Sequence, residues 1–158
     1  MKKTIALERN FAASIDEVWE LWTTKDGIES WWGPEGFTVT VDKLELRTGG
    51  ELHYNMTAVG PEQIGFMQKA GMPLTTKARI TFAEITPKSR LVYKNWVDFL
   101  PGVEAYEAET RVELFASAEG VRMVLTLEAM HSEYQTNLAV MGWESELGKL
   151  AKLLEARR

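Results

Sequence analysis

The chain has 158 residues, 45% of them hydrophobic and 26% charged, which is typical of a soluble globular protein and predicts one domain over residues 1–158. With 18 basic and 23 acidic residues the formal charge is −5, which argues against nucleic acid as a partner. The sequence has no cysteine, no signal-peptide pattern and no apolar run near the ~20 residues of a membrane span, so we expect a cytoplasmic protein.

The N-terminal part of the chain predicts one strand followed by two short helices. Residues 4–11, TIALERNF, alternate apolar and polar side chains with the period of a half-buried strand. Ser14 and Glu17 form a capping box at which the first helix begins. Asp26-Gly27 is predicted to end that helix, and IESWW forms a second helical turn that ends at Gly33-Pro34.

The middle of the chain predicts strands that pair as hairpins. FTVTVDKLEL and ELHYNMTA flank a Gly49-Gly50 turn, KARITFAEI and RLVYKNWV flank TPKS, and YEAETRVELFA and GVRMVLTLEAM flank SAEG. In YEAETRVELFA, charged side chains alternate with smaller or apolar ones. This alternation indicates that one face of the sheet is exposed to water.

The last segment, HSEYQTNLAVMGWESELGKLAKLLEARR, predicts a single long helix. Ser132 and Gln135 form a second capping box, and the apolar stripe consists of Trp143, Leu147, Leu150 and Leu154. About 24 residues at ~1.5 Å each give a rod of roughly 36 Å, which is long enough to cross a sheet. The predicted fold class is α+β, a curved antiparallel sheet wrapped around the C-terminal helix.

The motifs VWELW, WWGPEGFTV, LRTGGELHYNM, RLVY and GWESELGKLAKLL occur in this order, and with them the chain resembles the bacterial proteins similar to the activator of the Hsp90 ATPase. These proteins belong to the START-like (SRPBCC, Bet v 1-like) helix-grip superfamily, and the resemblance runs from about Lys3 to Leu154. It implies a cavity between sheet and helix that suits an apolar small molecule. The superfamily includes lipid carriers, polyketide binders, cyclases and chaperone activators, so the resemblance alone assigns no activity.

Strand alternation and the helix stripe predict the side chains that line this cavity. We expect a mostly apolar lining with a few polar groups, as in other small-molecule sites, formed by Trp31, Trp32, Leu52, Tyr54, Met56, Phe82, Tyr93, Asn95, Tyr106, Leu125, Leu127, Trp143 and Glu146. Trp31 and Trp32 are interpreted first as a plug that closes one end of the sheet, with one ring also touching a ligand. The alternative for Glu146 is exposure to water, and for Asn95 a hydrogen bond to the backbone.

Residues 59–76 are an insertion where a minimal family member would have a tight hairpin. Pro61 and Gly71 mark the start and the end of an amphipathic helix. We expect this helix to be a mobile lid over the cavity mouth, with lid residues Ile64, Phe66 and Met67. We expect the inserted helix to pack on a second apolar stripe of the long helix, formed by Tyr134, Leu138 and Met141. The alternative cover for that stripe is a second subunit, which would make the protein a homodimer.

The sequence contains no recognisable catalytic motif. His53 and His131 are the only histidines, and neither is spaced for a metal site, so no metal and no cofactor are expected. His53 is interpreted as a solvated strand residue and His131 as a helix-start residue. The favoured hypothesis is a non-catalytic protein that binds a small hydrophobic or aromatic molecule, lipids included. The alternatives are a chaperone-activator-like interaction protein in the stress response and a cyclase- or hydrolase-type enzyme that uses Glu146 or Tyr106.

Overall fold

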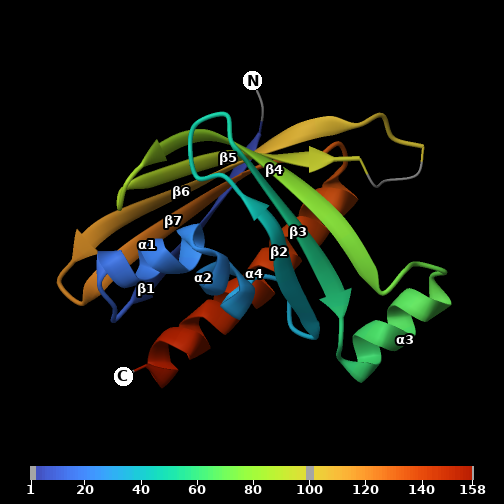
Figure 1. The fold of residues 1–158 in the computed structure, drawn as a ribbon, viewed down its shortest axis with the longest axis horizontal. Coiled ribbons are helices and arrows are strands. Elements are labelled where there is room, and N and C mark those ends of the chain that lie inside the picture. The colour runs from blue at the N-terminus through green and yellow to red at the C-terminus, as the bar shows by residue number, and fades with distance from the viewer. Residues whose placement is uncertain (1–2, 99–101, 158) are drawn as a thin grey trace.

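The computed structural model describes residues 3–98 and 102–157 (Figure 1). Its helices and strands follow the predicted order. They are β1 (Thr4–Phe11), α1 (Ile15–Thr23), α2 (Lys25–Trp31), β2 (Phe37–Leu44), β3 (Glu51–Ala58), α3 (Pro61–Lys69), β4 (Thr75–Thr86), β5 (Arg90–Val97), β6 (Tyr106–Ser117), β7 (Gly120–Glu128) and α4 (Glu133–Ala156).

The strands form a single antiparallel sheet in the order β1-β7-β6-β5-β4-β3-β2. The three predicted hairpins, β2–β3, β4–β5 and β6–β7, are confirmed by their pairing. Two further pairings join them, because β3 pairs with β4 across the inserted helix α3 and β5 pairs with β6. The first strand pairs with the last, with Thr4 opposite Glu128, so β1 forms one edge of the sheet.

Local hydrogen bonds explain where three of the helices begin. The Ser14 hydroxyl accepts from the Glu17 amide at 3.1 Å, and the Ser132 hydroxyl accepts from the Gln135 amide at 3.1 Å, which confirms both serine caps. The break between the first two helices lies at Thr24 and not at Asp26-Gly27. The Thr24 hydroxyl accepts from the Gly27 amide at 3.0 Å, so this glycine lies in the first turn of α2.

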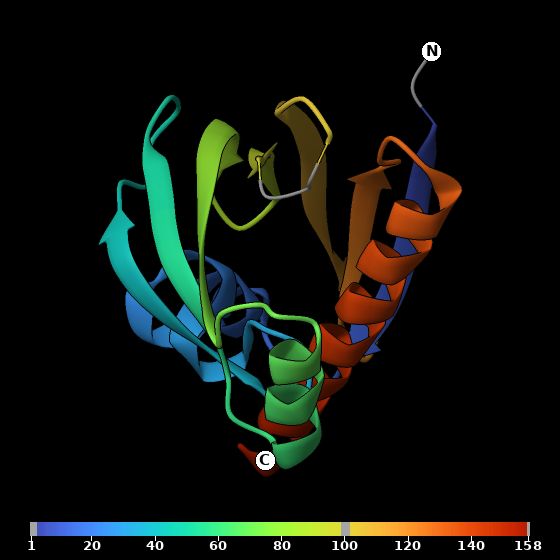
Figure 2. The ribbon, with the colours of Figure 1, turned by 90° about the vertical axis from the view of Figure 1, so that its right-hand side faces the viewer.

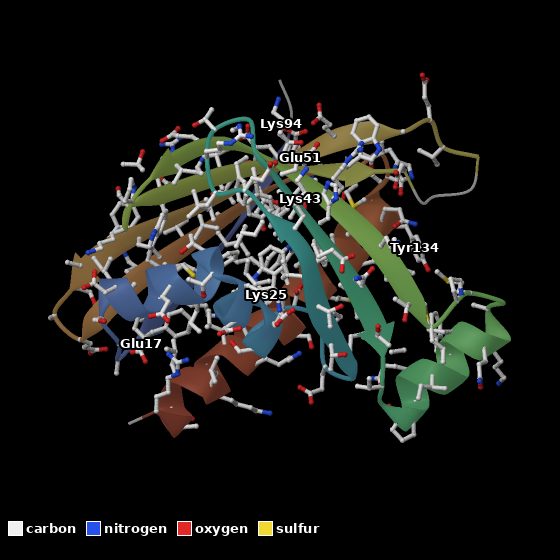
Figure 3. All side chains as sticks on the ribbon, viewed as in Figure 1. Glu17, Lys25, Lys43, Glu51, Lys94 and Tyr134 are labelled. Carbon is white, nitrogen blue, oxygen red and sulfur yellow. The ribbon has the colours of Figure 1, made fainter. Side chains whose placement is uncertain are left out.

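Helices α1, α2 and α4 lie on the same, inner face of the curved sheet (Figure 1). Inward-facing side chains of β7, such as Met123 and Leu125, are fully buried between the layers. The outer face is polar, as predicted, and carries Lys43, Glu51 and Lys94 (Figure 3). The arrangement is the predicted α+β architecture of a sheet wrapped around a long C-terminal helix. No helix in the described ranges is long and apolar enough to cross a lipid bilayer.

The inserted helix α3 forms where the sequence predicts it, but it docks elsewhere. Met67 is buried and Ile64 partly buried, whereas Phe66 is 68% exposed. The expected docking on the second stripe of α4 is wrong, because the stripe residues stay exposed: Tyr134, Leu138 and Met141. The reason is connectivity, because α3 connects the end of β3 to the start of β4 (Figure 2). The Gln63 side chain of α3 also lies against Gly36, in the loop before β2.

Candidate functional site

Four tryptophans close one end of the space between sheet and helices. The Trp22 ring centroid lies 4.8 Å from that of Trp31, 5.9 Å from Trp32 and 5.7 Å from Trp143. The indole of Trp31 donates to the Leu21 carbonyl at 2.9 Å, and Trp31 and Trp32 are 1% and 4% exposed. Both rings of the WW pair therefore lie in the core, and neither lines the cavities described below.

The loop after this pair is held by α4. The Glu146 carboxylate accepts from the Gly33 amide at 2.7 Å, and the Ser145 hydroxyl accepts from the Glu35 amide at 2.8 Å. One turn later, the Lys149 ammonium donates to the carbonyl of Gly33 at 2.9 Å and to that of Phe37 at 3.3 Å. Gly33 has φ of +90°, a conformation that favours glycine. These contacts fix the direction of the loop and therefore the positions of the two tryptophans before it.

Glu146 is a buried carboxylate with a strongly raised pKa. It is 8% exposed, and burial raises its pKa to about 7, against the opposing effects of the Gly33 hydrogen bond and the Lys149 charge. Burial also lowers the pKa of Lys149, an effect that the Glu146 carboxylate opposes. Glu146 consequently exchanges its proton near neutral pH although it lies inside the protein.

A cavity of about 200 Å³ lies between the inner sheet face and the first half of α4. Its aromatic and aliphatic walls include Tyr54, Leu127 and Trp143. Small side chains occupy the remaining inward positions and create the space: Ala78 and Ala108 from the sheet and Ala139 from the helix. The cavity thus exists because alanines stand where larger residues would complete the core.

The polar residues that line this cavity are Asn95 and Thr110, together with the charged residues Arg79, Glu109 and Glu128. The Asn95 amide nitrogen donates to the Ala108 carbonyl at 3.0 Å and to the Thr110 hydroxyl at 2.7 Å. Tyr54 keeps part of its surface accessible, yet the dense surroundings of its hydroxyl raise its pKa, and the Glu146 charge raises it further. Tyr54 therefore stays neutral at physiological pH.

Two donors buried behind the cavity have no hydrogen-bond partner among the described residues. They are the Trp32 indole nitrogen and the Tyr93 hydroxyl. Burial raises the pKa of Tyr93 well above its ordinary value. Electrostatic coupling to the ionisable groups of Tyr54 and Glu146 raises this pKa further, and the nearby Thr110 hydroxyl lowers it. Both groups are consequently neutral donors in an apolar environment.

A wider groove of about 770 Å³ adjoins the cavity, with which it shares the lining residues Glu128 and Met130. The groove lies beside the first turns of α4, because its lining includes Glu133, Thr136 and Asn137. The Tyr106 hydroxyl and the His131 Nδ1 atom, both in its lining, are 2.9 Å apart. No local pattern predicted this pair, because Tyr106 and His131 are 25 residues apart in the chain.

The predicted lining residues are found in three places. The inner cavity is lined by Tyr54, Asn95, Leu127 and Trp143, and the outer groove by Tyr106. Six others are buried in the core and line neither space: Trp31, Trp32, Leu52, Phe82, Tyr93 and Leu125. Met56 and Glu146 also line neither, and the same is true of the predicted lid residues Ile64, Phe66 and Met67.

Sequence reasoning missed the residues that make the cavity hollow. Ala78, Ala108 and Thr110 face inward by the same strand alternation that identified their larger neighbours. Their small size was the available signal.

His53 forms a 3.0 Å contact with Glu51, and His131 precedes the helix cap as expected. No group of three His, Cys, Asp or Glu side chains within the described ranges could hold a metal ion.

The profile of the family described as "Activator of Hsp90 ATPase homolog 1-like protein" matches residues 12–155. The chain belongs to this family. The match covers all of the chain except β1 and the residues at its two ends, and it includes the WW loop, the cavity walls and α4. No match was found among curated proteins.

Solved structures support the same fold over the whole chain. A crystal structure of a protein from Chromobacterium violaceum is 22% identical, covers 96% of each chain and has a TM-score of 0.79. The AHSA1 protein from Silicibacter pomeroyi is 19% identical, with 99% of this chain and 100% of that chain covered and a TM-score of 0.77. An AHSA1-like protein from Aeromonas hydrophila is 21% identical, with 98% and 94% covered and a TM-score of 0.73. These likenesses establish the Bet v 1-like helix-grip fold.

Proposed function

We propose that this family member binds a small hydrophobic or aromatic molecule in the inner cavity, with the outer groove as the way in. The observation that carries the proposal is the cavity of about 200 Å³ between the sheet and α4. Its lining surface is mainly apolar and comes from aromatic, aliphatic and small side chains, with the polar residues Asn95 and Thr110 and the charged residues Arg79, Glu109 and Glu128 also in the lining. This composition is typical of small-molecule sites.

The size of the cavity indicates the size of the molecule. An engineered apolar cavity of about 150 Å³ in another protein binds benzene, so this somewhat larger space accommodates one or two fused aromatic rings. Burial of about 200 Å² of apolar ligand surface contributes roughly 5 kcal/mol. Such a contribution alone corresponds to dissociation constants of roughly 0.1 to 1 mM.

The two alternative hypotheses have less support from the geometry. The enzyme hypothesis relied on Glu146 or Tyr106, but Glu146 is bonded to the Gly33 amide and Tyr106 lies in the outer groove beside His131. The chaperone-activator hypothesis draws on the description of the family only. Both alternative hypotheses stay predictions. The binding proposal, in contrast, can be tested by substitutions in the inner cavity.

The binding proposal is tested by a substitution that fills the cavity with a larger side chain. Ala139 lines the cavity from α4, so Ala139→Phe places a ring where the ligand would lie. Ala156 is exposed near the end of the same helix, and Ala156→Phe is the matched control. We expect naphthalene to bind the wild type and Ala156→Phe saturably in NMR titrations, and Ala139→Phe about tenfold more weakly or not at all. Unchanged binding in a folded Ala139→Phe variant would contradict the proposal.

A further inference from the structure

Resting on the proposed function, we infer that the inner cavity selects neutral aromatic molecules that carry a hydroxyl or N–H donor, and that Asn95 Oδ1 accepts the hydrogen bond from this donor. The inference concerns the chemical class of the ligand. It follows from the hydrogen bonds that Asn95 already makes and from the charges around the cavity.

The orientation of the Asn95 amide is fixed by its partners. A backbone carbonyl can only accept, so the atom 3.0 Å from the Ala108 oxygen is the amide nitrogen. The second hydrogen of that nitrogen is donated to the Thr110 hydroxyl at 2.7 Å. Both donors of Asn95 are therefore used. The carbonyl oxygen Oδ1, at the other end of the amide, has no hydrogen-bond partner among the described residues.

An acceptor without a partner makes an apolar cavity selective. A ligand that covers the Oδ1 oxygen of Asn95 without donating to it removes water and leaves the oxygen unsatisfied, which weakens binding. A ligand with a donor at this position avoids that loss. Tyr54 lines the same cavity and stays protonated, so its hydroxyl can donate to the oxygen of a ligand hydroxyl.

The charges around the cavity disfavour ionised ligands. The lining of the inner cavity includes one cation, Arg79, and two carboxylates, Glu109 and Glu128, and Glu146 is near enough to raise the pKa of Tyr54. The outer groove adds the carboxylates of Glu107 and Glu133 against one ammonium, that of Lys3, so carboxylates outnumber cations around both spaces. These carboxylates repel an anion, and the apolar walls make the burial of an ammonium group costly. The ligand class that remains is neutral and donates a hydrogen bond.

Four aromatic probes of the same ring size separate the requirements. Naphthalene tests the cavity alone, naphthol adds a donor, methoxynaphthalene replaces the donor by an ether, and naphthoate adds a negative charge. For the wild type at neutral pH we expect naphthol to bind about tenfold more tightly than naphthalene or methoxynaphthalene. We expect naphthoate to bind more weakly than naphthalene. Dissociation constants come from NMR titrations of the full chain.

Two variants assign the preference to one atom. Asn95→Leu removes the Oδ1 acceptor and is expected to bring naphthol down to the affinity of naphthalene. Asn55→Leu is the matched control: it makes the same substitution at an asparagine of β3 that bonds Thr40 and Asp42 and does not line the cavity, so the preference for naphthol should remain. Thermal melting establishes that each variant is folded, and the four wild-type titrations test the inference without any variant.

The outcomes distinguish this inference from the proposal on which it rests. If no probe binds the wild type, the proposed function fails and the inference fails with it. If naphthalene, naphthol and methoxynaphthalene bind equally well, the function stands and the inference is overturned. If naphthol binds best and Asn95→Leu keeps that preference, the assignment to Asn95 is overturned.

Discussion

The space under the inner face of β3, β4 and β5 is filled completely at one end of these strands and incompletely at the other. In the half next to α1 and α2, Leu52, Ile80 and Tyr93 are each 1% exposed. Two residues further towards the other end, the inward-facing positions on these strands are only partly buried: Tyr54, Ala78 and Asn95. The first group belongs to the hydrophobic core and the second lines the cavity.

Side-chain size and helix placement together explain this difference. The closed end is filled by tryptophans of α1, of α2 and of the residue after it, together with the last turns of α4. At the open end no second helix of the described ranges covers the sheet, because α3 lies at the ends of β3 and β4 (Figure 1). Alanines occupy inward positions there. Packing at the closed end therefore stabilises the fold, whereas the open end has room for a ligand.

The largest expected effect comes from breaking the closed end. Trp31 is 1% exposed and packs edge to face on Trp22, with its indole bonded to the Leu21 carbonyl. We expect Trp31→Ala to lower the free energy of unfolding by about 3 to 5 kcal/mol, measured by urea denaturation. Phe115 is 39% exposed on the outer face, and Phe115→Ala is expected to cost about 1 kcal/mol or less. Equal losses in the two variants would refute the claim that buried Trp31 stabilises the closed end.

The next effect concerns Glu146, which joins α4 to the loop beside the closed end. Its pKa is about 7 in the folded protein against an ordinary value of 4.5, so the folded state keeps a proton that the unfolded chain releases. Stability is therefore expected to fall as the pH rises from 4.5 to 7, by on the order of 3 kcal/mol, and to stay low above pH 7. Urea denaturation across this range measures the change.

Substitution of Glu146 isolates this contribution. Glu146→Gln keeps an oxygen for the Gly33 amide but cannot ionise, so its pH dependence should be flatter and its stability above pH 7 greater than that of the wild type. Glu144 lies on an exposed face of the same helix and pairs with Arg9, and Glu144→Gln is the control. If both variants follow the wild-type curve, Glu146 is not the titrating group.

The smallest effect is expected at the open end, on the exposed stripe of α4. Leu138 is 44% exposed, and Tyr134 lies at the end of the molecule away from α1 (Figure 3). Because these side chains are already in water, we expect Leu138→Asp to change the free energy of unfolding by about 0.5 kcal/mol or less. We also expect it to leave the mass measured by light scattering unchanged. A wild-type dimer that Leu138→Asp dissociates would show that a second copy covers the stripe.

Much of the architecture could be read from local patterns. The two serine caps, the strand alternation and the turn residues each depend on a few neighbouring positions, and the structure has the elements within a few residues of those predicted. The candidate site was less predictable. Alternation identified the inner face, but it could not show where along a strand the helices stop covering it, and so it could not distinguish buried Tyr93 from Asn95 at the cavity.

The sequence by itself determined the elements, the polar outer face and the family, because backbone hydrogen bonds and side-chain periodicity are set within a few residues. Only the tertiary structure decided the contacts between distant segments. It brought the Glu146 carboxylate to the amide of Gly33, 113 residues away, and the amide of Asn95 to the hydroxyl of Thr110 on the next strand. It also held α3 away from the stripe on α4. Such contacts depend on how the whole chain closes, which no local pattern contains.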